Sequence, residues 1–254
     1  MPRPIAARRQ DEILARLRVA GTVSVEELAD SFSVSRETIR RDLKSLAKRG
    51  RLEVVHGGAS RRSSETALTE RLGENPEGKS AIGRAAAGLV ENGMVVLLDS
   101  GATTLKVAEA LATKVDLTIA TNSLPIALVM CRVPGTRVHM LGGEIDCVDE
   151  AAFGIEVIEA LDRFRFDVAF VGAAGISEDG EITDFTRVAA EQRSRMLRAA
   201  KRAYLVADRS KFGRLTPIRI PDAELATAII VDAMPASPFA EAFQARGTEI
   251  IVAE

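Results

Sequence analysis

The sequence predicts an α/β protein in two parts: a small helical domain that ends in a β-hairpin, followed by a larger α/β domain with a mostly parallel sheet. Charge predicts the division, because residues 1–62 hold 14 lysines and arginines against 8 acidic residues, whereas the remainder holds 20 against 28. Periodicity predicts the two folds: amphipathic helices fill the basic part, and apolar strands alternate with helices in the acidic part. We expect the first domain at 1–59, a polar linker at 60–78 and the second domain at 79–254.

The first domain begins with two helices. Apolar residues at helical spacing predict a helix over about residues 8–19, which Gly21 ends. The second helix begins at Ser24, because Ser24-Val-Glu-Glu27 has the pattern of a capping box, in which the hydroxyl accepts from the backbone N–H three residues later. The predicted core positions of the two helices are Ile13, Leu14, Leu17, Val25, Leu28, Ala29 and Phe32.

A third helix follows the turn Ser33-Val34, with Ser35 as its predicted N-cap and Gly50 as its end. Its predicted buried residues are Ile39, Leu43 and Leu46. A short strand over 52–55 and the turn Gly57-Gly58 come next, which suits the wing of a winged helix. These elements together predict a winged helix-turn-helix domain.

The exposed face of this third helix matches the chemistry of base edges in the DNA major groove. An arginine can fork onto guanine, a threonine can touch a thymine methyl, and a glutamate can accept from cytosine. Lys44, Lys48 and His56 are better suited to phosphate contacts. The predicted DNA-binding residues are Ser35, Arg36, Glu37, Thr38, Arg40, Arg41, Lys44, Lys48 and His56. The alternative is that Arg40-Arg41-Asp42 forms a solvated, self-paired helix face.

The second domain is predicted from seven apolar strands, with helices between most of them. The strands are 94–98, 117–120, 138–141, 168–171, 203–207, 228–231 and 249–252. The helices are 79–91, 104–112, 153–161 and 188–199.

Four of these strands end in loops of small and hydroxyl-bearing residues, at the carboxyl edge where parallel sheets bind ligands. The loop from Asp99 to Thr104 leads directly into a helix, so Gly101 lets an anion approach the free N–H groups of the helix N-terminus. Lys211, which follows another strand, is expected to supply a positive charge; the alternative is that it pairs with Asp208 and holds the strand end together. The pattern predicts a phosphate site, although Gly and Thr also serve ordinary turns. The candidate loop residues are Asp99, Ser100, Gly101, Thr103, Thr104, Thr121, Asn122, Ser123, Gly142, Gly143 and Gly172, together with Lys211.

The run from Thr22 to Leu43, which ends in Ser-Arg-Glu-Thr-Ile-Arg-Arg-Asp-Leu, and Val55-His-Gly-Gly-Ala59 closely resemble the DeoR family of bacterial sugar-metabolism regulators. The resemblance covers nearly the whole chain. It implies that residues 22–41 form the DNA-binding helix-turn-helix and that the second domain shares the fold of ribose-5-phosphate isomerase. The matching loops would bind the phosphate and hydroxyls of a phosphorylated sugar, and Glu191 matches an acidic position of the family. Ala102 departs from the usual threonine.

The resemblance also implies repression that is relieved by a phosphorylated sugar or polyol effector. One winged helix reads only a half-site, so we expect at least a homodimer on double-stranded operator DNA. The alternative is a sugar-phosphate isomerase with a DNA-binding tail, with Asp184 and Glu191 as nearby carboxylates. The loop Gly172-Ala-Ala-Gly175 lacks the acidic residues of that enzyme, so we expect no catalytic residues.

Other classes are not favoured by the sequence. The histidines His56 and His139 and the cysteines Cys131 and Cys147 show no metal-ligand spacing, so we expect neither a metal nor a cofactor. An RNA-binding protein would need aromatic stacking residues, which the basic domain lacks. Without a secretory leader or an apolar run that could span a membrane, the chain is expected to be soluble and cytoplasmic.

Overall fold

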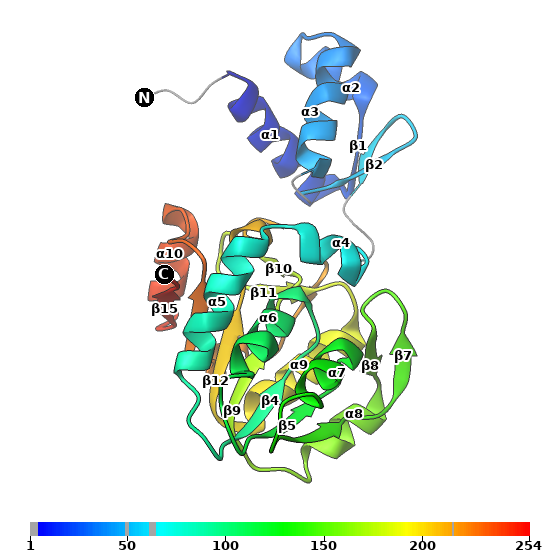
Figure 1. Cartoon of the computed structure of the whole chain (residues 1–254). Coiled ribbons are helices and arrows are strands. Elements are labelled where there is room, and N and C mark those ends of the chain that lie inside the picture. The colour runs from blue at the N-terminus through cyan, green and yellow to red at the C-terminus, as the bar shows by residue number, and fades with distance from the viewer. Residues whose placement is uncertain (1–4, 49–50, 61–64, 215) are drawn as a thin grey trace. The chain divides into compact units, whose positions relative to one another are not determined.

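The computed structural model of the chain describes residues 5–48, 51–60, 65–214 and 216–254. Its contacts group into two compact units (Figure 1). Unit 1 comprises residues 1–64 with 213–216, and unit 2 comprises residues 65–212 with 217–254. Among the described residues, no helix is long and apolar enough to cross a membrane.

Unit 1 is a three-helix domain with a small antiparallel sheet (Figure 1). Its elements are α1 (Ile5–Ala20), β1 (Thr22–Ser24), α2 (Val25–Phe32), α3 (Arg36–Lys48), β2 (Glu53–Val55) and β3 (Gly58–Ser60). β3 pairs with both β2 and β1. The hairpin of β2 and β3 confirms the predicted wing. The strand β1 was not predicted, because its three residues are too few to show an alternating pattern.

The predicted helix caps and core of unit 1 are confirmed. The Ser24 hydroxyl accepts from the backbone N–H groups of Glu26 and Glu27 at 3.1 and 3.4 Å, and the Ser35 hydroxyl accepts from Thr38 N at 3.1 Å. Phe32 is half-buried and packs at the edge of the core. The buried residues of the helices are Ile13, Leu14, Leu17, Val25, Leu28, Ala29, Ile39, Leu43 and Leu46. The predicted helix end at Gly50 lies outside the described residues.

Unit 2 is built on a seven-stranded sheet in which every neighbouring pair is parallel, in the order β15-β14-β12-β9-β4-β5-β6. These strands are β4 (Val95–Leu98), β5 (Thr118–Thr121), β6 (Arg137–Met140), β9 (Phe166–Val171), β12 (Ala200–Val206), β14 (Ala228–Val231) and β15 (Glu249–Val252). All seven predicted strands belong to this one sheet, so the prediction of a parallel α/β domain is confirmed.

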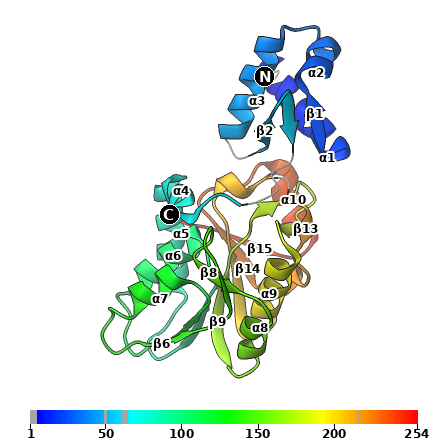
Figure 2. The same ribbon diagram turned by 90° about the vertical axis from the view of Figure 1, so that its right-hand side faces the viewer.

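Helices cover both faces of the sheet, as Figure 2 shows from its side. The helices are α4 (Leu68–Gly73), α5 (Pro76–Gly88), α6 (Ala102–Leu111), α7 (Leu124–Met130), α8 (Ile155–Leu161), α9 (Arg187–Arg198), α10 (Ser237–Ala245) and the 3₁₀ turns η1 (Arg209–Lys211) and η2 (Ala223–Leu225). α5, α6 and α7 share one apolar core, and α8, α9 and α10 share the other. Alternate residues of β4 enter opposite cores: Val96 and Leu98 face the first, and Leu97 the second.

Short strands outside the main sheet complete unit 2. They are β7 (Glu144–Asp146) and β8 (Ala151–Phe153), which form a hairpin, and β10 (Gly175–Ile176), β11 (Ile182–Asp184) and β13 (Ile218–Arg219), which form an antiparallel sheet. None of these was predicted, because strands of two or three residues carry too little periodicity.

The stretch expected to be a linker contains helical structure. α4 lies within residues 60–78, and α5 begins at Pro76 rather than at 79. Proline at the first turn of a helix is favourable, and Asn75 precedes it in the left-handed conformation. Residues 61–64 lie outside the described part of the chain, and the full extent of the linker stays a prediction.

Candidate functional site

The predicted recognition face of unit 1 is α3 together with the turn between β2 and β3. Every predicted side chain on it is exposed except Thr38, which is half-buried. Within the described residues, Arg41, Lys44 and Lys48 make no ion pair with an acidic side chain, whereas Arg40 lies 3.7 Å from the exposed Glu37 and Arg36 pairs with Glu26. A groove between α3 and the hairpin is lined by Arg40, Lys44 and His56, among others. Charged donors therefore face outward along one side of the unit.

Asp42 does not pair with its neighbours in sequence. It is buried, and it accepts from Arg9 Nε at 2.6 Å and from Gln10 Nε2 at 2.9 Å, both on α1. This carboxylate ties α3 to α1 and leaves Arg41 exposed. Of the self-paired helix face considered as an alternative, the structure shows the contact between Arg40 and Glu37, but Asp42 pairs with α1 and not with its neighbouring arginines.

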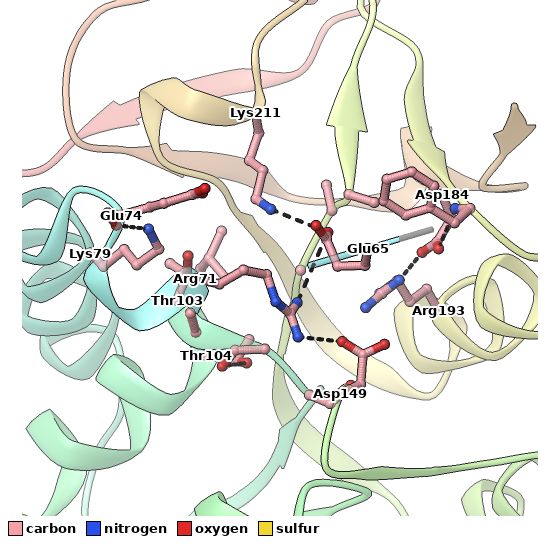
Figure 3. A pocket seen from close by; sticks show the side chains of 18 residues that line it. Glu65, Arg71, Glu74, Lys79, Thr103, Thr104, Asp149, Asp184, Arg193 and Lys211 are labelled. Carbon is pink, nitrogen blue, oxygen red and sulfur yellow. Dashed lines mark hydrogen bonds and ion pairs between the residues drawn. The ribbon is translucent and has the colours of Figure 1, made fainter. Parts of the chain in front are cut away.

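A pocket in unit 2 lies at the switch point of the parallel sheet. The chain runs outward from β4 to β5 and β6 on one side, and from β9 to β12, β14 and β15 on the other, so β4 and β9 are the central neighbours. Loops that follow two adjacent strands leading in opposite directions leave a crevice between them. The loops after β4, β9 and β12 line this pocket, which we call the switch-point pocket, and Figure 3 shows its side chains.

One wall of the switch-point pocket is the N-terminus of α6. Gly101, the residue before this helix, makes no side-chain cap and has φ = 141°, a conformation that side-chain-bearing residues rarely adopt. The first-turn N–H groups therefore point toward the pocket without a capping side chain. Ser100 is buried, lines the pocket, and its hydroxyl has no hydrogen-bond partner in the part of the chain that is described. Both features offer donors to an anion.

Cationic side chains line the opposite wall, as Figure 3 shows. Lys211 Nζ lies 3.5 Å from the Glu65 carboxylate, and Arg71 reaches both Glu65, at 4.0 Å, and Asp149. Lys79 donates to the Glu74 carbonyl and lies 3.0 Å from Asp208. Burial acts to raise the pKa of Asp208, but attraction to Lys79 and Lys211 and hydrogen bonds from Ser210 outweigh it, so the pKa lies below its ordinary value. The ion pair between Lys79 and Asp208 thus ties the end of β12 to α5.

A buried charge network forms the floor of the pocket. Arg193 on α9 donates to Asp99 Oδ2 at 2.7 Å and pairs with Asp184, while Gly172 N donates to the same Asp99 oxygen at 3.0 Å. Burial acts to lower the pKa of Arg193, yet attraction to Asp99, with its hydrogen bond, and to the carboxylates of Asp149 and Glu65 raises it above its ordinary value. The network locks the loops after β4 and β9 together.

Asp149 is a half-buried acid at the pocket's rim, in the loop between β7 and β8. The loop is held by Asp146, whose carboxylate accepts from the backbone N–H groups of Val148 and Asp149 at 2.7 and 2.9 Å. Burial raises the pKa of Asp149, and its attraction to Arg71 and Arg193 offsets only part of that rise.

The structure brings only some of the predicted effector residues together. Ser100, Gly101, Thr103, Thr104, Gly172 and Lys211 line the pocket, and Asp99 lies beneath it. The other predicted residues are Thr121, Asn122, Ser123, Gly142, Gly143 and Glu191, and the residues that line the pocket do not include them. Asn122 donates to the Ala152 carbonyl at 3.0 Å, Ser123 caps α7, and Glu191 is exposed. Their role as ligand contacts stays a prediction.

Sequence reasoning missed six charged pocket residues: Glu65, Arg71, Glu74, Lys79, Asp149 and Arg193. Two of them had a detectable signal. Arg193 stands within the apolar stripe of α9 formed by Ala189, Ala190, Met196 and Leu197, and a charge at such a position requires a buried partner. Arg71 stands likewise near the buried Leu68. Glu65 and Asp149 lie outside regular elements and carry no such signal.

The described residues contain no group of three or more histidine, cysteine or acidic side chains placed to hold a metal ion. Cys131 and Cys147 are exposed free thiols, and His139 lies exposed on the edge strand β6 with its ring 5.1 Å from that of Phe164.

Family models match both units. A model described as the DeoR-like helix-turn-helix domain matches residues 9–65, and one described as the DeoR C terminal sensor domain matches residues 74–233. The glycerol-3-phosphate regulon repressor of Escherichia coli strain K12 is 33% identical over 229 residues, which cover 89% of this chain and 91% of that protein. The HTH-type transcriptional repressor GlcR of Bacillus subtilis strain 168 is 31% identical over 245 residues, covering 95% and 94%.

Solved structures give a weaker likeness. Ribose 5-phosphate isomerase A from Methanocaldococcus jannaschii aligns at 18% identity over 55% of each chain, with a TM-score of 0.40. The sequence relatives, which span nearly the whole chain, confirm the resemblance predicted from residues 22–43.

Proposed function

The chain belongs to the DeoR family of transcription regulators, and we propose that it represses a sugar or polyol operon until a phosphorylated metabolite binds the switch-point pocket. Unit 1 is its DNA-binding domain. The observation that carries the effector proposal is one juxtaposition: the uncapped N-terminus of α6, Ser100, whose hydroxyl has no partner in the described chain, and the cations Lys211 and Arg71 all line the same pocket. A phosphate group needs this combination of N–H donors, a hydroxyl and positive charge.

The pocket also suits the rest of such a ligand. Asp149, the half-buried carboxylate at the rim, is an acceptor for sugar or polyol hydroxyls. The name of the Escherichia coli relative makes glycerol 3-phosphate one member of the panel to test. Trioses, pentoses and hexoses with one phosphate complete that panel.

On the DNA side, we propose that Arg41 reads a guanine and that Lys44, Lys48 and His56 contact phosphates. Arg41 and Lys48 are exposed and make no ion pair with the residues that the structure describes, which supports this assignment, because neither has to break such a pair before it binds DNA. We also propose that the chain binds a repeated operator as a homodimer or larger oligomer, which light scattering of the full chain, alone and with operator, would test. The cytoplasmic location stays a prediction.

The phosphate assignment is tested with Lys211→Ala in the full chain. Ligand that binds only the folded state raises the melting temperature by mass action, so wild type should be stabilised by members of the phosphate panel. The variant should lose that stabilisation and the release of operator by the same compound, while keeping operator affinity. Lys201→Ala is the matched control, because Lys201 is an exposed lysine of the same unit that pairs with Asp167. A Lys211→Ala chain that still releases operator at the wild-type effector concentration would contradict the assignment.

The isomerase alternative is tested directly. Asp184, the pocket carboxylate considered for proton transfer, is paired with Arg193, which ties it to the pocket floor. We expect the purified chain to leave pentose and hexose phosphates unchanged. Isomerisation of any of these sugars that persists through purification would support the alternative.

A further inference from the structure

Glu65 is an acidic side chain placed among the cations of the switch-point pocket. Its Oε2 atom lies 3.5 Å from Lys211 Nζ and 4.0 Å from an Arg71 nitrogen, and its Oε1 accepts from Thr66 N at 3.1 Å. The side chain is only 10% exposed. Figure 3 shows the Glu65 carboxylate between Lys211 and Arg71, facing the same space as Thr103 and Thr104. The two cations proposed to hold a phosphate therefore already hold an anion.

The space left in the pocket is too small to enclose a whole phosphorylated sugar. About 40 Å³ is free, whereas a cavity that holds a benzene-sized ligand measures about 150 Å³. A phosphorylated sugar is larger than benzene. The position beside Lys211 and Arg71, where its phosphate would bind, is taken by the Glu65 carboxylate, which lies within 4.0 Å of both.

The neighbours of Glu65 allow it to leave without disturbing the rest of the pocket. Arg71 retains its second partner, Asp149, and α4 stays attached because Leu68 N donates to the Val148 carbonyl at 2.9 Å. A phosphate would replace the lost partner of Lys211 with a group of higher charge.

We propose that Glu65 is an internal competitor of the effector: its carboxylate occupies the phosphate position until the effector's phosphate displaces it. The inference rests on the proposed function, since it requires an anion to bind at Lys211. It also identifies the step that carries the signal. Glu65 stands five residues after Ser60, the last residue of β3 in unit 1, so its release frees the start of unit 2 at the point where the chain arrives from the DNA-binding domain.

The physical basis is a population shift between two states of one segment. The effector binds the state in which Glu65 is released and is excluded from the state in which it is docked. Its apparent affinity is therefore reduced by the fraction of chains in the docked state. Neutralising Glu65 removes its charge-assisted contacts and lowers the docked fraction.

The test uses the full chain and inorganic phosphate as the probe, at constant ionic strength, with binding measured by calorimetry and by melting temperature. We expect Glu65→Gln to bind phosphate about tenfold more tightly than wild type, because a hydrogen bond between charged groups no longer has to be broken. Glu70→Gln is the matched control: Glu70 is an exposed acid of α4, and its replacement should leave phosphate affinity unchanged.

The outcomes separate the two proposals. If Lys211→Ala abolishes phosphate binding but Glu65→Gln binds no more tightly than wild type, the pocket assignment stands and the competition is overturned. If phosphate binds wild type and Lys211→Ala equally, or binds neither wild type nor Glu65→Gln, both proposals fail. If both Glu65→Gln and Glu70→Gln bind phosphate more tightly than wild type, the change in the net charge of the chain explains the effect. That result would also overturn the proposal that Glu65 competes with the effector.

Hydrogen exchange of wild type gives a second measurement that needs no variant. Saturating phosphate should slow exchange in peptides over residues 100–104 and speed it in peptides over 65–67, whose contacts it breaks. Slower exchange in both segments would mean that Glu65 remains docked while phosphate is bound, and would overturn the proposal.

Discussion

The recognition face of unit 1 and the switch-point pocket of unit 2 both carry lysines and arginines. Those on the recognition face are exposed, whereas those in the pocket are buried and paired. On α3, Arg41, Lys44 and Lys48 are exposed and make no ion pair within the described chain. In the pocket, Lys211, Arg71 and Arg193 are buried and paired with carboxylates. An exposed cation binds a polyanion without breaking an internal contact, whereas a buried, paired cation must exchange one anion for another.

Because of this difference, one chain can bind DNA without a prior rearrangement and bind an anionic effector only by displacing an internal carboxylate. The exposed face provides binding energy whenever DNA is present, because counterions are all that it releases. The pocket gains affinity only through the difference between the incoming anion and the internal one, which is the condition for a ligand to shift an equilibrium. The first arrangement suits a reader of DNA, and the second suits a switch.

The largest difference in stability between the two sites is expected when the buried cation of the pocket floor is removed. Arg193→Met leaves Asp99 and Asp184 buried without their partner, which should cost about 3–5 kcal/mol of the free energy of unfolding. Arg41→Met, the matched change on the exposed face, should stay within about 0.5 kcal/mol. Urea unfolding of the full chain, followed by far-ultraviolet dichroism, measures both. Equal losses would mean that burial does not distinguish the two sets of charges.

A smaller effect is expected when the exposed face loses its base-reading side chain. Arg41→Ala should weaken binding to an operator selected from random-sequence DNA by about 1–3 kcal/mol and should weaken random DNA much less. Lys48→Ala is the control on the same helix, expected to weaken both DNAs alike and to lower the slope of affinity against salt concentration. If Arg41→Ala reduces operator and random binding equally, Arg41 contacts phosphate and not a base.

Sequence patterns predicted the regular elements well, because these depend on local periodicity. The seven strands of the parallel sheet, the buried face of α3 and the loop from Asp99 to Thr104 at the start of α6 all follow from spacing in short windows. The carboxyl edge of a parallel sheet is a general site for ligands, so the loop could be assigned a role before its neighbours were known.

The missed residues depend on contacts that are distant in sequence. Lys211 meets Glu65 across 146 positions, Arg71 meets Asp149 across 78, and Arg193 meets Asp99 across 94. No local pattern specifies such pairs, and Glu65 stands in a stretch whose polar composition predicted only a linker. The loops that hold Asn122 and Ser123 show the converse: hydroxyl and amide groups after a strand also serve the backbone, as the Asn122 bond to Ala152 does.

The smallest expected effect concerns the pH dependence of the pocket's half-buried acid, Asp149. Burial raises its pKa in the folded chain, so between its unfolded and folded pKa values the folded state holds more protons than the unfolded state. Stability contributed by this group is therefore present at low pH and falls as pH rises through that interval. Asp149→Asn removes the pH-dependent contribution of this carboxyl group to stability. The melting temperature of the variant minus that of wild type should therefore increase from pH 4 to pH 7 in phosphate-free buffers. A difference that decreases over the same range would mean that Arg71 dominates and that the pKa is lowered.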